Sequence, residues 1–365
     1  MEIVVSKEEL ARGVNTVNKA VPGKTTMPIL ECILFDATDG KIKLTANDME
    51  MAVETSVDGD TAEYGKAAID ARMLTELVKK LPDSDVTIKT DSTTALIRCD
   101  KVKANIPIRN GEDYPAIPAV QRGLAVTISQ FSLRDIIRQT IFSADESNVN
   151  KLMGGELFEI SGSSLKVVAL DGHRIATRSL ELRGDFGNQK VVIPAKTLNE
   201  ISRILNGGVN DEVSIYLTGN HALFEFAGTT VVTRLIDGDY FDTAKMTNME
   251  STTQVRINKR EFLESIDRST LFVSNTDKKP VIVDITDDRL EWSVKTMSGG
   301  MTEDLEIKKS GEDIKIGFNP RFLIDALRAI DDEEITLHLI TPKMPCIIKD
   351  DKNSYLYLIL PVNFA

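Results

Sequence analysis

The chain has 365 residues, of which 42% are hydrophobic and 27% are charged. This length exceeds what one hydrophobic core usually supports, so two or three domains are expected. The formal net charge of −12 excludes a protein that coats nucleic acid with its whole surface, because affinity for phosphate comes from clustered Lys and Arg. Any contact with DNA must be confined to part of the surface.

No apolar run approaches the roughly 18 residues of a membrane helix, and residues 1–6 lack the features of a signal peptide. These observations favour a cytoplasmic protein. Cys32, Cys99 and Cys346 are odd in number, far apart and outside any CxxC motif, which predicts neither a disulfide framework nor a zinc site. We expect them in the core, and we expect no metal and no cofactor.

Three stretches begin with a polar cap at Ser6, Ser129 and Asn258, and each cap precedes a short amphipathic helix. The apolar positions of these helices are Leu10, Val14 and Val17, then Leu133, Ile136, Ile137 and Ile141, and then Phe262, Ile266 and Leu271. A shared cap and a shared spacing indicate an internal repeat.

A second triplet fixes the period of the repeat. Ile69, Ile193 and Phe318 each end a predicted strand that leads into a helix. The step from Ile69 to Ile193 is 124 residues (193 − 69), and the step from Ile193 to Phe318 is 125 (318 − 193). A period of this size is that of a whole domain, not of a solenoid unit.

Between the helices lie alternating segments with turns near Asp39-Gly40 and Asp287-Asp288, which predict hairpins. Each repeat therefore reads as strand, helix, strands, helix, strands. Turn-rich breaks near residues 115–123 and 243–253 mark the junctions. We predict domains over residues 1–121, 122–250 and 251–365.

Four segments in the order KTTMPIL (24–30), LDGHRIA (170–176), LIDGDY (235–240) and YLILPV (357–362) resemble the beta subunit of bacterial DNA polymerase III. The resemblance spans the whole chain. It implies an α+β DNA clamp fold of three tandem repeats, with helices lining the inside and sheets outside, in a head-to-tail dimeric ring around duplex DNA. It also implies a non-catalytic processivity factor, a DNA sliding clamp.

The size of the repeats agrees with a ring of two chains. A domain of about 120 residues has a diameter of about 35 Å. Three touching spheres of this size leave a hole of only about 5 Å, whereas six leave about 35 Å, and only the second admits duplex DNA, about 20 Å wide with grooves roughly 8 Å deep. A homodimer is therefore expected, closed through nonidentical faces.

The resemblance further assigns three sets of residues, each transferred position by position. The apolar peptide-binding pocket would comprise Met153, Leu170, Gly172, His173, Arg174, Ile175, Phe241, Met246, Leu358, Leu360, Pro361 and Val362. The DNA-binding residues would be Lys24, Arg72, Lys151, Lys196 and Arg321. The dimer interface would place Lys101, Lys103, Ala104 and Ile106 against Phe272, Val273, Glu303 and Asp304.

The implied partners are sequence-independent duplex DNA, the replicative polymerase catalytic subunit, the clamp loader, and repair polymerases, ligase or mismatch-repair proteins that carry short peptide motifs. Asn150, Phe241 and Thr243 depart from the usual family residues, which are Arg, Pro and Tyr. The peptide preference of the pocket, the affinity of the dimer and spontaneous ring opening stay open.

Two other functions compete with that of a clamp. An enzyme with three domains around a cleft should show convergent acids, a nucleophile or metal ligands, and the sequence shows none; Gly23-Lys24-Thr25 lacks the first glycine of a phosphate-binding loop, since position 18 is Asn. A three-repeat peptide-binding scaffold that does not encircle DNA is the remaining alternative, because the negative net charge permits it.

Overall fold

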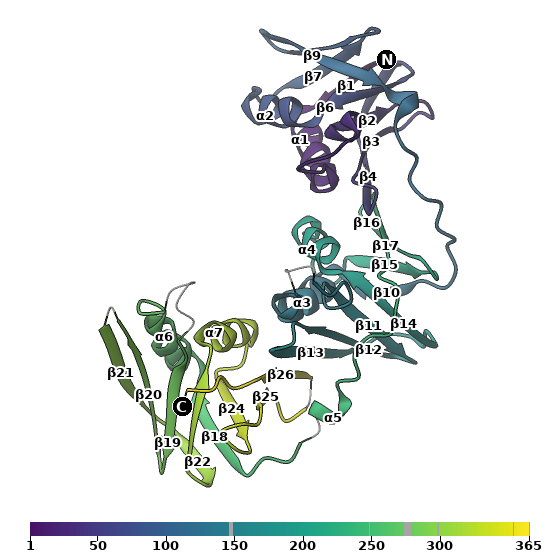
Figure 1. The fold of residues 1–365 in the computed structure, drawn as a ribbon. Coiled ribbons are helices and arrows are strands. Elements are labelled where there is room, and N and C mark those ends of the chain that lie inside the picture. The colour runs from purple at the N-terminus through teal and green to yellow at the C-terminus, as the bar shows by residue number, and fades with distance from the viewer. Residues whose placement is uncertain (146–148, 248, 274–278, 298, 353, 365) are drawn as a thin grey trace. The chain divides into compact units, whose positions relative to one another are not determined.

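The structure is a computed structural model that describes residues 1–365 except 146–148, 248, 274–278, 298, 353 and 365. It contains three successive repeats, each with a strand, a helix, several strands, a second helix and three final strands (Figure 1). We call β1–β9 the first repeat, β10–β17 the second and β18–β26 the third. This order confirms the α+β class and the tandem triplication.

The first helix of the first repeat begins at the predicted cap Ser6, and its second helix begins at Asp70. Its elements are β1 (Glu2–Ser6), α1 (Lys7–Val17), η1 (Asn18–Ala20), η2 (Pro28–Glu31), β2 (Cys32–Asp36), β3 (Ile42–Asn47), β4 (Met51–Val57), β5 (Gly59–Glu63), β6 (Lys66–Asp70), α2 (Ala71–Lys80), β7 (Asp85–Thr90), β8 (Thr94–Cys99), β9 (Val102–Asn110) and η3 (Gly111–Asp113). The Ser6 side chain accepts a hydrogen bond from the Glu9 amide at 3.2 Å, and Asp70 accepts one from the Met73 amide at 2.7 Å. These caps satisfy amides that a helix leaves unpaired at its start.

The second repeat follows the same order. Its elements are β10 (Val126–Ser129), α3 (Gln130–Thr140), η4 (Ile141–Ser143), β11 (Gly155–Ser161), β12 (Ser164–Leu170), β13 (Arg174–Glu181), β14 (Asn188–Pro194), α4 (Ala195–Ile204), β15 (Glu212–Leu217), β16 (His221–Phe226) and β17 (Thr229–Arg234), and α5 (Ala244–Thr247) leads to the third repeat. The turn between β16 and β17 has Ala227 at φ 44°, and the matching turn between β8 and β9 has Asp100 at φ 49°. Equivalent turns therefore align the last hairpins of the two repeats.

The third repeat carries the same caps as the first. Its elements are β18 (Thr253–Asn258), α6 (Lys259–Ser269), β19 (Val281–Thr286), β20 (Arg289–Thr296), β21 (Gly299–Glu306), β22 (Lys308–Gly311), β23 (Ile314–Phe318), α7 (Pro320–Ala329), β24 (Glu334–Leu339), β25 (Cys346–Lys349) and β26 (Tyr355–Ile359). Asn258 accepts from the Glu261 amide at 3.0 Å. In its core, buried Trp292 donates its indole N–H to Ser265 at 2.6 Å, so the ring is buried without an unpaired donor.

Two compact units emerge from the contacts, and each includes part of the second repeat. Unit 1 comprises residues 1–131 and 203–235, and unit 2 comprises residues 132–202 and 236–365. Among the described residues, unit 1 contains a 13-stranded sheet in the order β10-β15-β16-β17-β4-β3-β2-β6-β9-β8-β7-β1-β5. Helix α1 packs on β3 and β4 of this sheet and lies beside α2 (Figure 1).

Unit 2 contains two sheets in its described part. One is 9-stranded, in the order β14-β11-β12-β13-β26-β25-β24-β18-β22, and the other is 4-stranded, in the order β21-β20-β19-β23. Helices α6 and α7 pack against each other. Phe262 of α6 and Leu327 of α7 belong to one buried apolar cluster that also includes Trp292. Burial of this alternating apolar surface holds the third repeat together.

Cys32, Cys99 and Cys346 are free and buried, as predicted. Within the described ranges, no group of three or more His, Cys, Asp or Glu side chains is arranged to hold a metal ion. None of the helices described is long and apolar enough to span a bilayer.

Candidate functional site

Successive repeats are joined by continuous β-sheet. In unit 1, β17 of the second repeat pairs antiparallel with β4 of the first, with Val232 opposite Ala52. The buried hydroxyls of Thr55 and Thr229 share a hydrogen bond of 2.8 Å across this seam. The first junction is thus a strand pair with a satisfied polar contact in its interior.

The second junction, in unit 2, repeats this pattern. Strand β26 of the third repeat pairs antiparallel with β13 of the second, and Leu358 lies opposite Ile175. In both junctions the third strand after the first helix of one repeat pairs with the last strand of the next repeat. The rule has a counterpart at the chain's two ends: β21 of the third repeat and β9 of the first.

In the described part of the chain, β21 and β9 have no strand paired where their counterparts have one. Among the described residues, β21 pairs only with β20 and forms one edge of its sheet. Strand β9 pairs with β8 along residues 102–107 and with β6 only at residues 108–110. Each repeat that ends the chain therefore presents an open strand edge at the position where the other repeats are joined.

The predicted pocket residues come together beside the second junction. Leu170, Ile175 and Leu358 belong to one buried apolar cluster, and Met153 and Leu360 pack against it half-buried. We call this set the junction cluster. Its residues come from the second and the third repeat, so the pairing of β13 with β26 assembles it.

A tight turn between β12 and β13 supports one side of the junction cluster. The Asp171 carboxylate accepts hydrogen bonds from the amides of His173 at 3.0 Å and Arg174 at 3.1 Å. Gly172 has φ +83° with open space around it, a conformation that favours glycine. The His173 carbonyl accepts a hydrogen bond from the Leu360 amide at 2.9 Å, which ties the turn to the C-terminal strand.

The remaining predicted pocket residues lie at the margin of the cluster. Phe241 is 40% exposed and lies edge-on to Tyr240, with ring centroids 6.0 Å apart. Met246 is exposed, and no described contact brings it to the cluster. Pro361 is half-buried, and the Val362 amide donates to the Gly317 carbonyl at 2.8 Å.

Two of the departures from the family pattern have a clear structural place. The Asn150 side chain accepts a hydrogen bond from the Leu152 amide at 3.1 Å, so it shapes the turn that precedes Met153. Thr243 is buried, and its carbonyl accepts from the Met246 amide at 3.0 Å. Both residues shape backbone at the rim of the cluster.

The Arg174 side chain is engaged by other residues of the chain. Its Nε donates to Asp171 at 2.9 Å and its Nη1 donates to Asp325 at 2.6 Å. Sequence reasoning missed Asp325 and also Phe322, whose ring centroid lies 4.6 Å from the guanidinium carbon. Both missed residues lie on α7, about 150 positions further along the chain, and no local motif signals them.

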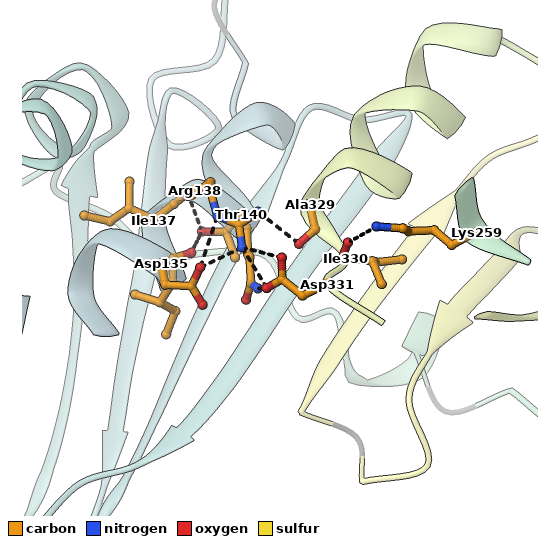
Figure 2. A network of polar contacts seen from close by, with 10 residues as sticks. Asp135, Ile137, Arg138, Thr140, Lys259, Ala329, Ile330 and Asp331 are labelled. Carbon is orange, nitrogen blue, oxygen red and sulfur yellow. Dashed lines mark hydrogen bonds and ion pairs between the residues drawn. The ribbon is translucent and has the colours of Figure 1, made fainter. Parts of the chain in front are cut away.

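A second polar link joins the same two repeats, as Figure 2 shows. Arg138 near the end of α3 donates to the Asp331 carboxylate at 2.9 Å and to the Ala329 carbonyl at 3.4 Å. The Lys259 ammonium donates to the neighbouring carbonyl of Ile330 at 2.9 Å. These cations satisfy carbonyls at the C-terminus of α7, where a helix leaves acceptors unpaired.

The predicted DNA-binding cations are exposed. Arg72, Lys196 and Arg321 are each the second residue of a helix, of α2, α4 and α7 respectively. Lys24 lies in the segment between η1 and η2, and Lys151 lies in the turn before β11. One cation therefore recurs at the start of the second helix of every repeat.

The predicted interface residues lie on or beside the two open edges. Lys103, Ala104 and Ile106 belong to β9, with Lys101 in the turn before it. Glu303 and Asp304 belong to β21. Phe272 and Val273 follow α6 and pack half-buried against the core of the third repeat.

The two acidic interface residues have partners within the chain. Arg268 donates from Nε to Glu303 at 2.9 Å, and this hydrogen bond holds the pKa of Glu303 below its ordinary value. The Arg289 Nε lies 3.5 Å from the Asp304 carboxylate. Both exposed pairs are weakened by salt.

One buried acid stands out from the rest of the site. Glu156 in β11 is completely buried, and burial raises its pKa to about 8. Its carboxyl contacts the Thr140 hydroxyl at 3.1 Å and 3.2 Å. Sequence reasoning missed it, although the alignment of the repeats places it where aliphatic residues stand elsewhere.

The chain is similar to known proteins along its whole length. Three family models match in succession: the N-terminal domain of the DNA polymerase III beta subunit over residues 1–118, its central domain over 127–242 and its C-terminal domain over 248–363. A beta sliding clamp of Staphylococcus epidermidis is 29% identical, with 99% of each chain covered.

Solved structures agree. A DNA polymerase III beta subunit from Eubacterium rectale is 53% identical with a TM-score of 0.96, and all of both chains is covered. A DNA polymerase sliding clamp from Bacillus subtilis is 30% identical with a TM-score of 0.95, again over both whole chains. The chain therefore belongs to the DNA polymerase III beta subunit family, the sliding clamps that serve DNA replication as non-catalytic processivity factors.

Proposed function

We propose that two copies of this chain close head to tail into a ring that surrounds duplex DNA. The observation that carries this proposal is the pair of open edges on β21 and β9. Each edge is the counterpart of a strand that is paired at an in-chain junction. Pairing β21 of one copy with β9 of the other completes a ring with six equivalent strand pairs. Four of them lie within the two chains, and two join one chain to the other.

The in-chain junctions also supply the register of the new pair. Ala52 lies five residues past its hairpin partner Asn47, and Gly300 lies five past Lys295. By the same matching of hairpins, Asn105 in β9 takes the place of Val232 in β17. Gly300 should therefore lie opposite Asn105 of the second copy, as Ala52 lies opposite Val232 at the first junction.

This register explains the chemistry of the predicted interface. In an antiparallel pair, Met301 lies opposite Ala104, and Lys101 lies opposite Asp304. Phe272 lies within 3.3 Å of the Cβ position that Gly299 lacks, which brings it towards Ile106 of the second copy. An apolar centre with opposite charges beside it is selective for one orientation.

A scaffold that binds peptides without surrounding DNA is the alternative, and the open edges count against it. An exposed strand edge is a site of unwanted pairing unless it is covered. The ring covers both edges with one contact, whereas a monomeric scaffold leaves both uncovered.

DNA would be held by the recurring helix-start cations together with Lys24 and Lys151. The proposal rests on the position of Arg72, Lys196 and Arg321, one exposed cation at the same place in every repeat. Helix N-termini add partial positive charge. Contacts of this kind attract phosphates without reading bases, which suits a protein that slides.

Replacing Arg72, Lys196 and Arg321 together with Glu should lower loading onto nicked circular DNA roughly tenfold at physiological salt, because phosphate neutralisation is lost. The matched control replaces Lys89, Lys190 and Arg256, one exposed strand cation from each repeat, with Glu. It makes the same change in net charge. Equal losses in both triple variants would show that net charge, and not these positions, governs DNA contact.

The junction cluster, with Gly172, His173, Phe241, Met246, Pro361 and Val362 around it, is the proposed pocket for short apolar peptides. Its support is the convergence of half-buried Met153 and Leu360 on a buried apolar floor. Flexible Met and aliphatic side chains can accept several related anchors. The proposed partners are the polymerase catalytic subunit, the clamp loader, repair polymerases, ligase and mismatch-repair proteins.

Leu360→Ser should weaken binding of the replicative polymerase catalytic subunit by about tenfold or more, because an apolar contact is replaced by a hydroxyl. Retention of the clamp on circular DNA should not change. Met344→Ser, at an exposed turn between β24 and β25, is the control. Unaltered polymerase affinity in Leu360→Ser would place the pocket elsewhere.

A solved Pseudomonas aeruginosa clamp bound to griselimycin shows that such a clamp takes a small ligand, and we propose the junction cluster as the corresponding place here. Because a replication clamp acts on chromosomal DNA, we also propose that the protein works in the cytoplasm. No cofactor is required for tethering.

A further inference from the structure

The Arg174 side chain has several partners within its own chain. Besides Asp171 and Asp325, it donates from Nη2 to the Phe142 carbonyl, and its side chain is only 13% exposed. The guanidinium carbon lies over the ring of Phe142, 5.4 Å from its centroid, and over the ring of Phe322, 4.6 Å from its centroid. Three of its five N–H donors are thus used by these contacts inside the chain.

The fold does not demand an arginine at this position. The equivalent of Arg174 at the start of the third strand in the first repeat is Met51, which is buried and apolar. In the third repeat the equivalent is Gly299. The strand pairing forms without a guanidinium in the first repeat, so the Arg174 contacts serve something specific to the second junction.

What is specific to this junction is the proposed pocket. The His173 ring stacks on Phe322 with centroids 6.0 Å apart and planes at 23°. The His173 carbonyl holds the Leu360 amide. The turn that carries His173 is thus attached to α7 by Arg174 and to the C-terminal strand by its own backbone.

We infer that Arg174 and Asp325 form a clasp that positions the pocket for partner binding. The clasp fixes the distance between the 171–174 turn and α7. It thereby fixes the position of His173, in the pocket wall, relative to Leu360. Arg174 acts as a positioning residue through its side chain, and Asp325 takes part although it is not a pocket residue. The inference rests on the proposed pocket at the junction cluster.

Linkage gives the clasp a second consequence. A partner that binds only the assembled pocket must stabilise the clasp by the same free energy by which the clasp favours binding. Loss of the Asp325 charge therefore lowers partner affinity from a position outside the pocket. Arg174 is largely buried and binds the carboxylates of both Asp171 and Asp325. Loss of the Asp325 charge should therefore lower partner affinity more than loss of a charge from an exposed ion pair would.

The test compares Asp325→Asn with Asp284→Asn in the full-length clamp. Asp284 pairs with Lys315 at 2.9 Å and has a similar exposure, 38% against 35% for Asp325. The probe is the catalytic subunit of the replicative polymerase from the same organism. Asp325→Asn should raise its dissociation constant about tenfold, Asp284→Asn less than twofold, and Asp325→Glu should restore most of the affinity.

A double-mutant cycle separates positioning from general destabilisation. Arg174→Lys and Asp325→Asn should each weaken binding, and the double variant should be no weaker than the poorer single variant, because both break one clasp. A dissociation constant within twofold of wild type for Asp325→Asn overturns the inference. If Leu360→Ser also binds normally, the proposed pocket itself fails; if Leu360→Ser loses binding while Asp325→Asn does not, only the clasp fails.

Discussion

Glu156→Gln is expected to raise the free energy of unfolding by about 4 kcal/mol over wild type at pH 8 and by no more than about 1 kcal/mol at pH 5. The reason is the burial of an acid in an apolar core. The carboxyl is completely buried, and its pKa is raised to about 8. A buried charge without a charged partner is costly, so the group stays protonated instead.

The hydrogen bonds around Glu156 agree with a neutral carboxyl. The Thr140 hydroxyl has one proton, and it lies 2.8 Å from the Ile136 carbonyl, which can only accept. Of the two contacts between Glu156 and that hydroxyl, at 3.1 Å and 3.2 Å, one is then a hydrogen bond that the protonated carboxyl donates to the hydroxyl oxygen. An ionised Glu156 would compete with the carbonyl for the same hydrogen.

The other repeats show that the fold needs no acid here. Glu156 pairs with Ile193, as Ile33 pairs with Ile69 and Val281 pairs with Phe318. Ile33 and Val281 are both 0% exposed. An aliphatic side chain therefore occupies the equivalent core position twice.

The direction of the pH dependence follows from the raised pKa. Unfolding returns Glu156 to an ordinary pKa near 4.5, so between about pH 4.5 and 8 the folded chain holds more protons than the unfolded chain. The contribution of the neutral carboxyl is complete below pH 4.5 and declines as pH rises towards 8. Glutamine keeps the shape and removes this decline.

Urea unfolding from pH 5 to pH 8 measures the effect. Glu159→Gln, three positions along β11 and half-exposed beside Lys190, is the control and should retain the wild-type slope. Glu156→Val, which copies the third repeat, should also flatten the slope. If Glu156→Gln keeps the wild-type decline, the acid is not the source of it.

A chain carrying Ala104→Cys and Met301→Cys should close into a covalent dimer under mild oxidation, with nearly all chains cross-linked. The register taken from the in-chain junctions places these two residues opposite each other in neighbouring copies. Cα atoms of directly opposite residues in an antiparallel pair lie about 4.5–5.5 Å apart, within the range for a disulfide. The native cysteines are buried and should not compete.

The control moves one cysteine from β9 to β5, at one end of the same sheet. Ala62 is exposed on β5, the strand that ends the 13-stranded sheet. This edge has no counterpart in the junction rule. Ala62→Cys with Met301→Cys should give little cross-linking on a non-reducing gel. If this pair cross-linked efficiently and Ala104→Cys with Met301→Cys did not, β21 would contact β5 of the second copy and the proposed pairing with β9 would be wrong.

The sequence predicted the repeats because their signals are local. Ser6 and Asn258 cap helices through amides three residues away, and the strand before each second helix recurs at a fixed period. Pocket residues such as Leu170 and Leu358 came from family resemblance, and the structure brings them into one cluster. Their role in peptide binding stays a prediction.

Other features could not be predicted because they depend on contacts between distant segments. The partner of Arg174 lies on α7, and an isolated Asp325 in a helix carries no sign of that contact. The register of β21 against β9 needs the pairing of four other strands as a template. Glu156 is different, because aligning the three repeats places it at the position of Ile33 and Val281 and so identifies it as an acid in the core.

We propose that the ring stays on DNA because the DNA passes through it, and not because it binds the DNA tightly. The Ala104→Cys, Met301→Cys clamp should be loaded onto a nicked plasmid in reduced form and then oxidised, and its retention should be measured in 1 M salt by gel filtration. Because charge contacts are screened at that ionic strength, only a threaded ring stays with the plasmid, and cutting the plasmid once with a restriction enzyme should release it. Clamp that stays bound to the linear product, or leaves the uncut circle while still cross-linked, would contradict encirclement.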